Sequence, residues 1–197
     1  LDETGYLFRP PLYGFDFNRY WGGFSGKSRK KIGREIDALG DLEYSHDGLS
    51  PSDIEWMFET NRAVFGPDSF FDDPRFLSGF EKMLSLLAEN GMLHVLTVRS
   101  GGRRAAVDAG AVCGGRYTVL AGATGHEFPG IAKAMNLEQI RWSCSMRFDS
   151  VDFLCGDFGW KERFHLEPRP LYILNKAASG EPVETVRERK SDLVIAS

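Results

Sequence analysis

The stretch VDFLCGDFGWKERF, residues 151–164, is the best guide to the fold of this 197-residue chain. Its first five residues are apolar or β-forming apart from one aspartate, which predicts a buried strand. Gly156 and Asp157 end that strand, and Trp160 and Lys161 follow in a short turn. Strand ends of α/β proteins open onto the crevices where ligands bind, so this turn is a candidate site. The alternative is structural, with Asp157 capping a short helix and Trp160 filling the core.

Along the whole chain, helical spacing and Gly-Gly turns predict an alternation of helices and strands. Apolar residues three and four apart predict helices, and short apolar runs between Gly-Gly turns predict an antiparallel meander. The predicted helices occupy residues 25–39, a segment starting at Ser50-Pro51, a segment ending at Asn90-Gly91, and a segment after Pro129. The predicted strands are residues 42–45, 92–98, 104–112, 117–121, 151–155 and 170–174. This order predicts an α/β fold with a mixed sheet.

The domain organisation follows from composition along the chain. Residues 1–24 are aromatic and broken by Pro and Gly, which predicts a packed arm. Residues 25–174 hold the predicted elements and fit one domain. Residues 175–197 are polar and charge-mixed, which predicts a tail.

Overall composition narrows the functional classes. A hydrophobic fraction of 42% is enough for a core, and a formal charge of −4 gives no general attraction to nucleic acid or anionic membrane. Cys113, Cys144 and Cys155 lie in apolar settings, which favours reduced thiols and a cytoplasmic protein. No apolar run approaches about 18 residues, so no membrane span is expected. The four histidines lack ligand spacing, and no metal site is expected.

Two further places carry candidate chemistry. Asp108 lies among small apolar residues, where desolvation would raise its pKa and suit it to accept a proton. Strand alternation offers the alternative that Asp108 lies on a solvated face. The loop from Thr124 to Ile131 leads into a helix N-terminus, whose free N–H groups suit pyrophosphate or an oxyanion. It is otherwise an ordinary strand-to-helix loop.

The helix at residues 25–39 opens with a basic cluster. Its members are Lys27, Arg29, Lys30, Lys31 and Arg34. This cluster is either a solvated helix face or a clamp for a phosphate or carboxylate group.

The element order and three motifs together resemble the GNAT acyltransferase fold. The closest branch is that of the CelD/BcsL-type acetyltransferases and FemABX aminoacyltransferases. The motifs are the basic opening at residues 25–31, the helix after Pro129-Gly130, and the ending from Asp152-Phe153 through Gly156-Asp157 to Trp160-Lys161. The resemblance covers roughly residues 24–174 and implies a GNAT-like mixed, largely antiparallel sheet flanked by helices.

This resemblance implies an N-acyltransferase that moves an acyl group from acetyl-coenzyme A or another acyl-coenzyme A to an acceptor amine. Lys161 would stabilise the developing oxyanion, and Asp108 or Glu127 would take the amine proton. The residues implied to bind the cofactor are His126, Phe128, Gly130 and Ile131. The residues implied to bind substrate are Trp160, Asp157, Lys27 and Arg29.

The family also implies partners. The acceptor is expected to be a small-molecule, cell-envelope or peptide amine, with no membrane partner. Members often contain two GNAT-like halves, so residues 1–24 would be an arm or a linker from a missing upstream half, or the chain would form a homodimer.

One departure from the family pattern keeps two alternatives open. The loop at residues 124–130 lacks the R/QxxGxG/A pyrophosphate motif of ordinary GNAT enzymes, and Glu127 beside a pyrophosphate is unfavourable. The first alternative is an aminoacyl-tRNA-dependent, FemABX-like transferase, which predicts salt-sensitive tRNA binding by the basic helix. The second is a catalytically inactive GNAT-fold binding module.

Overall fold

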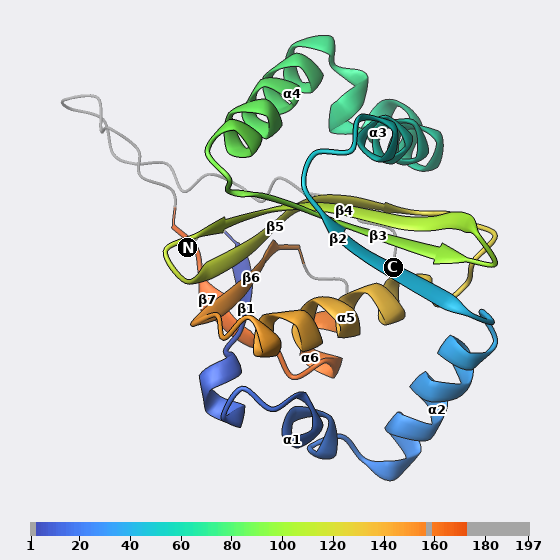
Figure 1. Cartoon of the computed structure of the whole chain (residues 1–197), viewed down its shortest axis with the longest axis vertical. Helices are drawn as coiled ribbons and strands as arrows, with labels where there is room; N and C mark the ends of the chain where they lie inside the picture. Colours follow the sequence, from blue (N-terminus) through green and yellow to red (C-terminus); the bar gives the residue numbers. More distant parts are fainter. Residues whose placement is uncertain (1–2, 157–158, 173–197) are drawn as a thin grey trace, which may run out of the picture.

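The computed structural model describes residues 3–156 and 159–172, which fold around one seven-stranded sheet (Figure 1). The strand order is β2-β3-β4-β5-β6-β1-β7, and every neighbouring pair is antiparallel except β5 and β6. The strands are β1 (Thr4–Phe8), β2 (Leu42–Asp47), β3 (Leu93–Ser100), β4 (Arg103–Cys113), β5 (Arg116–Thr124), β6 (Ser150–Cys155) and β7 (Glu167–Pro170). The prediction of a mixed, largely antiparallel sheet with flanking helices is confirmed.

Helices cover both faces of the sheet (Figure 1). On one face lie α3 (Pro51–Phe65) and α4 (Pro74–Glu89), whose apolar sides pack on β3, β4 and β5. On the other face lie α1 (Phe17–Gly22), α2 (Gly26–Asp37), α5 (Ile131–Ser145) and α6 (Trp160–Arg163). Short 3₁₀ turns complete the fold at Pro10–Tyr13, Gly66–Asp68 and Phe70–Asp72. Most of α5 is buried, because it crosses from β5 to β6 over the centre of the sheet.

Residues 3–24 contribute a strand and a helix to the fold. β1 is an inner strand between β6 and β7, and its Tyr6 and Phe8 are buried in the main core cluster. Tyr20 of α1 is also fully buried, and its hydroxyl donates to the carbonyl oxygen of Phe164 at 2.8 Å. The described part of this segment therefore packs into the same sheet and core as the rest of the chain. The strand is only five residues long, too short for periodicity to reveal its pairing.

The last strand lies elsewhere than predicted. β7 covers Glu167–Pro170 and pairs with β1, whereas the sequence favoured the more apolar residues 170–174. An edge strand needs hydrogen bonds on one side only, so it tolerates Pro168 and Pro170. Asp157, residues 173–174 and the predicted tail at residues 175–197 lie outside the described residues.

The sheet opens between its two parallel strands. β5 and β6 pair only where Arg116, Tyr117 and Thr118 face Ser150, Val151 and Asp152. In β5 the register shifts just beyond this point, because Ala109 pairs with Ala121 while Gly110 pairs with Val119. The extra residue is Leu120, which forms a bulge. Within the described residues, the remainder of β5 and β6 is unpaired on the sides that face each other.

Candidate functional site

A cavity of about 580 Å³ lies where α2, the start of α5 and α6 come together. This volume is in the range of small-molecule and cofactor sites. Its apolar wall is made by Phe24, Ile32, Trp160 and Phe164. Its polar wall is made by Ser28, Lys31, Glu35, Lys133, Asn136, Glu162, Arg163 and His165. The cavity therefore offers aromatic surface, several cations and the beginning of a long helix.

The first turns of α5 shape the inner end of the cavity. Gly130 precedes the helix with a φ of 94°, a left-handed conformation that favours glycine, and it lines the cavity. Lys133 donates to the Glu35 carboxylate at 2.7 Å, which ties α5 to α2. Asn136 is only 8% exposed and lines the cavity, and its side chain makes no hydrogen bond to any described residue. Its amide is not among the buried polar atoms that lack a partner, so it reaches the open space of the cavity, where it can bind a polar ligand group.

Lys161 is buried at the end of β6, next to the cavity rather than in its wall. Its Nζ donates to the carbonyl oxygens of Phe153 at 2.9 Å and Cys155 at 2.7 Å, with a longer contact of 3.4 Å to Leu154. Leu154 has a φ of 55° and Gly156 a φ of 95°. These left-handed residues turn successive carbonyl groups toward one point. In this structure the ammonium group thus faces backbone carbonyls, where the sequence predicted a reacting carbonyl.

Trp160 lies beside Lys161 and presents its ring to the cavity wall. The ring packs edge-on against Phe153 and Phe164, with centroids 5.8 and 5.5 Å away. Lys161 contacts the end of β6, and Trp160 precedes it in α6. This arrangement holds the indole in one position.

Asp108 lies under α5 and is 3% exposed. It accepts a hydrogen bond from Nε2 of Gln139 at 2.5 Å, and desolvation raises its pKa to about 7. The expected direction of the pKa shift is confirmed, and the alternative of a solvated strand face is wrong. Asp108 is not among the residues that line the cavity.

Some side chains of the loop before α5 lie at the surface, and others lie in the core. Glu127 accepts from Arg103 at 2.9 Å, and the side chain of His126 is 94% exposed. Phe128 and Ile131 are buried in a core cluster with the sheet, so their side chains support the helix start and do not face a ligand. Of the four residues expected to bind the cofactor, the structure brings Gly130 to the cavity.

Among the residues expected to bind substrate, Trp160 lines the cavity. Lys27 and Arg29 lie on the exposed face of α2, beside the lining residues Ser28 and Lys31. Asp157 cannot be placed, since it falls outside the described residues.

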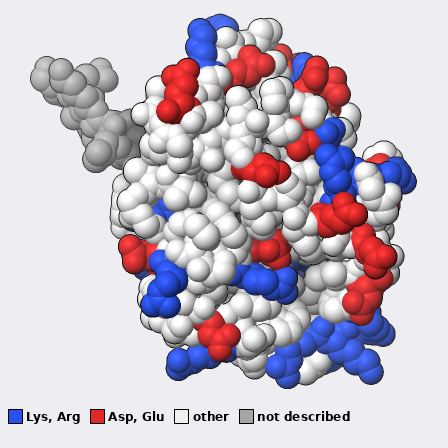
Figure 2. Space-filling view, viewed as in Figure 1, with Lys and Arg blue, Asp and Glu red and all other residues white. Residues whose placement is uncertain are grey.

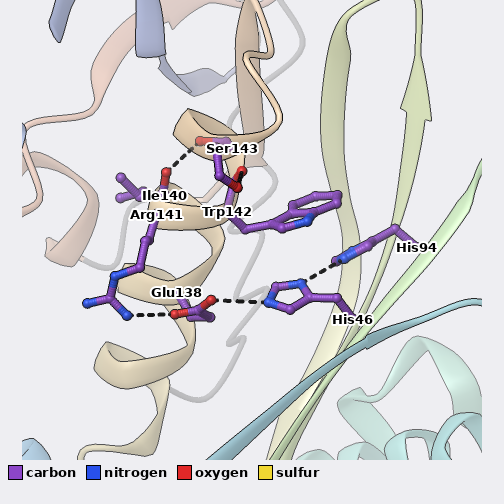
Figure 3. Close-up of polar contacts among 8 residues, drawn as sticks. His46, His94, Glu138, Ile140, Arg141, Trp142 and Ser143 are labelled. Atoms are coloured by element: carbon purple, nitrogen blue, oxygen red, sulfur yellow. Dashed lines mark hydrogen bonds and ion pairs between the residues drawn. The ribbon is translucent and has the colours of Figure 1, made fainter. Parts of the chain in front are cut away.

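A polar chain that the sequence did not predict lies under the middle of α5 (Figure 3). His46 contacts His94 through Nδ1 and Nε2 at 3.1 Å, and its Nε2 lies 3.1 Å from Oε1 of Glu138. Arg141 donates to the other oxygen of Glu138 at 2.7 Å. The ring of His94 stacks on Trp142 with centroids 3.7 Å apart.

No local motif could have revealed this chain, because its members come from β2, β3 and α5. The available signal was strand parity. His46 pairs with Leu96, which lies two residues from His94, so both histidines face the same side of the sheet.

None of the helices in residues 3–156 and 159–172 is long and apolar enough to cross a membrane. The same residues contain no group of three or more His, Cys, Asp and Glu side chains arranged to hold a metal ion.

Comparison with solved structures relates the fold to known proteins. FemX superposes with a TM-score of 0.61 and 10% identity, covering 84% of this chain and 59% of FemX. L-PGS from Bacillus licheniformis gives a TM-score of 0.57 and 10% identity, with coverage of 85% and 58%. The C-terminal DUF2156 domain of a protein named as a lysylphosphatidylglycerol synthetase, from Agrobacterium fabrum, gives 0.54 and 12%, with coverage of 85% and 58%. At this identity the likeness shows the fold alone, and the chain spans less than two thirds of each of these structures.

Sequence comparison assigns the family. Among curated proteins, none matches this chain. A family model described as acetyltransferase (GNAT) domain matches residues 26–162, from the start of α2 to α6. The match spans more than half of the chain and includes most of the cavity wall. The protein therefore belongs to the GNAT acetyltransferase domain family, as the resemblance of its motifs predicted.

Proposed function

We propose that this protein is an N-acyltransferase that takes an acyl group from acyl-coenzyme A and transfers it to an acceptor amine. Membership of the GNAT family supports acyl transfer in general. The observation that carries the choice of donor is the cavity at the start of α5, the helix that connects β5 to β6.

The cavity and the unpaired edge of β5 offer groups that suit different parts of coenzyme A. Phosphate groups suit the positive end of α5 and the nearby cations Lys31 and Arg163. The amides of the pantetheine arm can pair with the free edge of β5 beyond Thr118, as an added strand does. Glu127 is held at the surface by Arg103, which lessens its repulsion of a phosphate at the helix start.

The reaction needs a carbonyl held in place and an amine that loses a proton. The amine nitrogen attacks the thioester carbonyl carbon, the C–N bond forms, the C–S bond breaks, and the thiol leaves with a proton. We propose that Glu127, which is solvent-accessible, accepts the amine proton as general base, and that the buried Asp108 does not. Lys161 is assigned a positioning role, since its ammonium group holds the end of β6 and, through α6, the ring of Trp160.

We propose that the acceptor amine belongs to a small molecule, a cell-envelope component or a peptide. FemX and L-PGS each extend well beyond the part that this chain covers. We propose that the acceptor surface is completed by a second GNAT-like half or by a second copy of the chain.

Titration calorimetry with acetyl-coenzyme A tests the donor. We expect saturable binding by the wild type and at least tenfold weaker binding, about 1.4 kcal/mol, for Asn136→Leu, which fills the polar end of the cavity. The matched control is Asn18→Leu, at an exposed position of α1. Absence of heat from the wild type at millimolar ligand would reject acyl-coenzyme A as donor and favour the binding-module alternative.

The second candidate is an aminoacyl-tRNA-dependent transferase. The exposed cations of α2 and the fold shared with FemX support it. It predicts that tRNA binds this protein and that the affinity falls steeply with salt. Equal gel mobility of tRNA with and without the protein at low salt would eliminate it.

A further inference from the structure

The outer face of α2 carries a cluster of exposed cations. Lys27, Lys30, Lys31 and Arg34 share this face, and Arg29, also exposed, lies about 200° round the helix from Lys27. Among the described residues none of them is in an ion pair, while Glu35 on the inner face of the helix pairs with Lys133. Figure 2 shows the resulting cluster of Lys and Arg at the lower end of the molecule, where Figure 1 places α2.

This arrangement is electrostatically unfavourable for an isolated helix. Lys27 and Arg29 lie in the first turns, at the positive end of the helix dipole, where anionic groups are preferred. Lys27, Lys30 and Arg34 also repel one another across single turns. The apolar side of α2 packs on the core through Ile32 and Ile36, but this packing does not reduce the repulsion among the cations on the outer side. An anionic partner on this face would remove both penalties.

The same helix borders the cavity. Ser28 and Lys31 belong to α2 and line the cavity wall. A macromolecule seated on the outer face of α2 would therefore stand at the cavity mouth. Asn136 also lines the cavity, and its side-chain amide faces the open space with no hydrogen bond to the described residues. A flexible polar arm that enters from α2 could reach that amide.

We propose that α2 docks an acidic carrier protein, which delivers the acyl group to the cavity as a thioester of its phosphopantetheine arm. This proposal rests on the proposed acyl transfer. The reacting bonds are the same as with coenzyme A: the amine forms the C–N bond, the C–S bond breaks, and the thiol of the arm leaves with a proton. Coenzyme A and the carrier share the phosphopantetheine chemistry, whereas the outer face of α2 recognises the protein.

The dimensions of the surface favour an acidic protein over a nucleic acid. The basic strip is one helix of 12 residues, about 18 Å long, which matches one acidic helix of a partner. Nucleic-acid binding draws on a wide basic surface that neutralises several phosphates. The rest of the visible face carries acidic and basic residues side by side (Figure 2), and the net charge is −4.

The test combines direct binding with kinetics. Fluorescence anisotropy measures the affinity for a labelled bacterial acyl carrier protein in its holo form, and steady-state assays compare the acetylated carrier with acetyl-coenzyme A. The variant Lys30→Glu/Arg34→Glu reverses two cations that do not line the cavity. The control Arg62→Glu/Lys82→Glu reverses two exposed cations on the opposite face, in α3 and α4.

We expect the α2 variant to bind the carrier about tenfold more weakly and to raise its KM similarly, while kcat/KM for acetyl-coenzyme A stays within about twofold. The control should resemble the wild type with both donors. Failure of the wild-type protein to bind the holo carrier at about 100 µM, or an equal loss with both donors, overturns the proposal. Tight tRNA binding that the α2 variant abolishes also overturns it and makes α2 an RNA surface. Carrier binding without turnover of either donor would retain the docking surface and reject the proposed acyl transfer.

Discussion

The Nδ1 atom of His46 lies 3.1 Å from the Nε2 atom of His94, although the residues are 48 positions apart. Burial lowers the pKa of His94 to about 3, with His46 nearby adding to the shift, so His94 is neutral at pH 7. A consistent tautomer assignment has His94 donating to His46 and His46 donating to Glu138. This assignment leaves Nδ1 of His94 as a buried acceptor without a partner among the described residues.

The pKa shifts of His94 and Asp108 predict opposite pH effects on stability. The unfolded histidine binds a proton below about pH 6.5 while the folded one stays neutral to about pH 3, so stability falls as the pH falls through this range. Folded Asp108 keeps its proton up to about pH 7 while the unfolded acid ionises near pH 3.8, so stability falls as the pH rises. Between about pH 4 and pH 6.5 the two contributions oppose each other.

Single substitutions should therefore reveal a pH dependence of stability that is largely cancelled in the wild type. From pH 6.5 to pH 4.5, Asp108→Asn should lose about 2 kcal/mol of stability relative to the wild type, because the histidine contribution remains. His94→Gln should gain a similar amount over the same range. Urea unfolding at pH 4.5, 5.5 and 6.5 provides the measurement. Parallel pH profiles for all three proteins would contradict the assigned burial effects.

Lys161→Met should destabilise the protein by about 2–3 kcal/mol, because it leaves several buried carbonyl groups without their donor. Urea unfolding measures the loss, and Lys82→Met on exposed α4 should change stability by less than about 0.5 kcal/mol. A stable Lys161→Met protein that binds donor but does not turn it over would instead place the ammonium group on the reacting carbonyl.

Gly122→Ala should destabilise the protein by about 2 kcal/mol, since an added Cβ would overlap the carboxyl group of Asp108. Combined with Asp108→Ala, the loss should be smaller than the sum of the single effects, because the overlap is gone. Gly79→Ala is the control: it lies in α4 with open space around it, and should stabilise the protein by up to about 1 kcal/mol. Additive losses in the double variant would show that Asp108 is not the group being displaced.

Under the proposed function, Glu127→Gln should lower kcat for amine acylation by about 100-fold, as loss of a general base does. Asp108→Asn should leave kcat within about fivefold at pH 7.5, because Asp108 is buried from solvent and hydrogen-bonded to Gln139, whereas Glu127 is accessible. The assay follows release of coenzyme A thiol, with donor affinity measured separately for each variant. The reverse ranking of the two variants would transfer the base role to Asp108.

The sequence by itself determined the elements whose signals are local. Helical spacing located α2, α4 and α5, Gly-Gly turns located the β3-β4-β5 meander, and the apolar run before Gly156 located β6 with its neighbouring turn. These signals need only a few consecutive residues, because the periodicity of an element and the conformation of a turn depend on neighbours along the chain.

Tertiary structure alone decided what depends on pairing between distant segments. The insertion of β1 beside β6 and the contact of His46 with His94 each join separate parts of the chain. Asp108 shows the division within one residue. Its apolar neighbours predicted a raised pKa, but its burial was decided by α5 crossing the sheet and placing Gln139 over the carboxyl group.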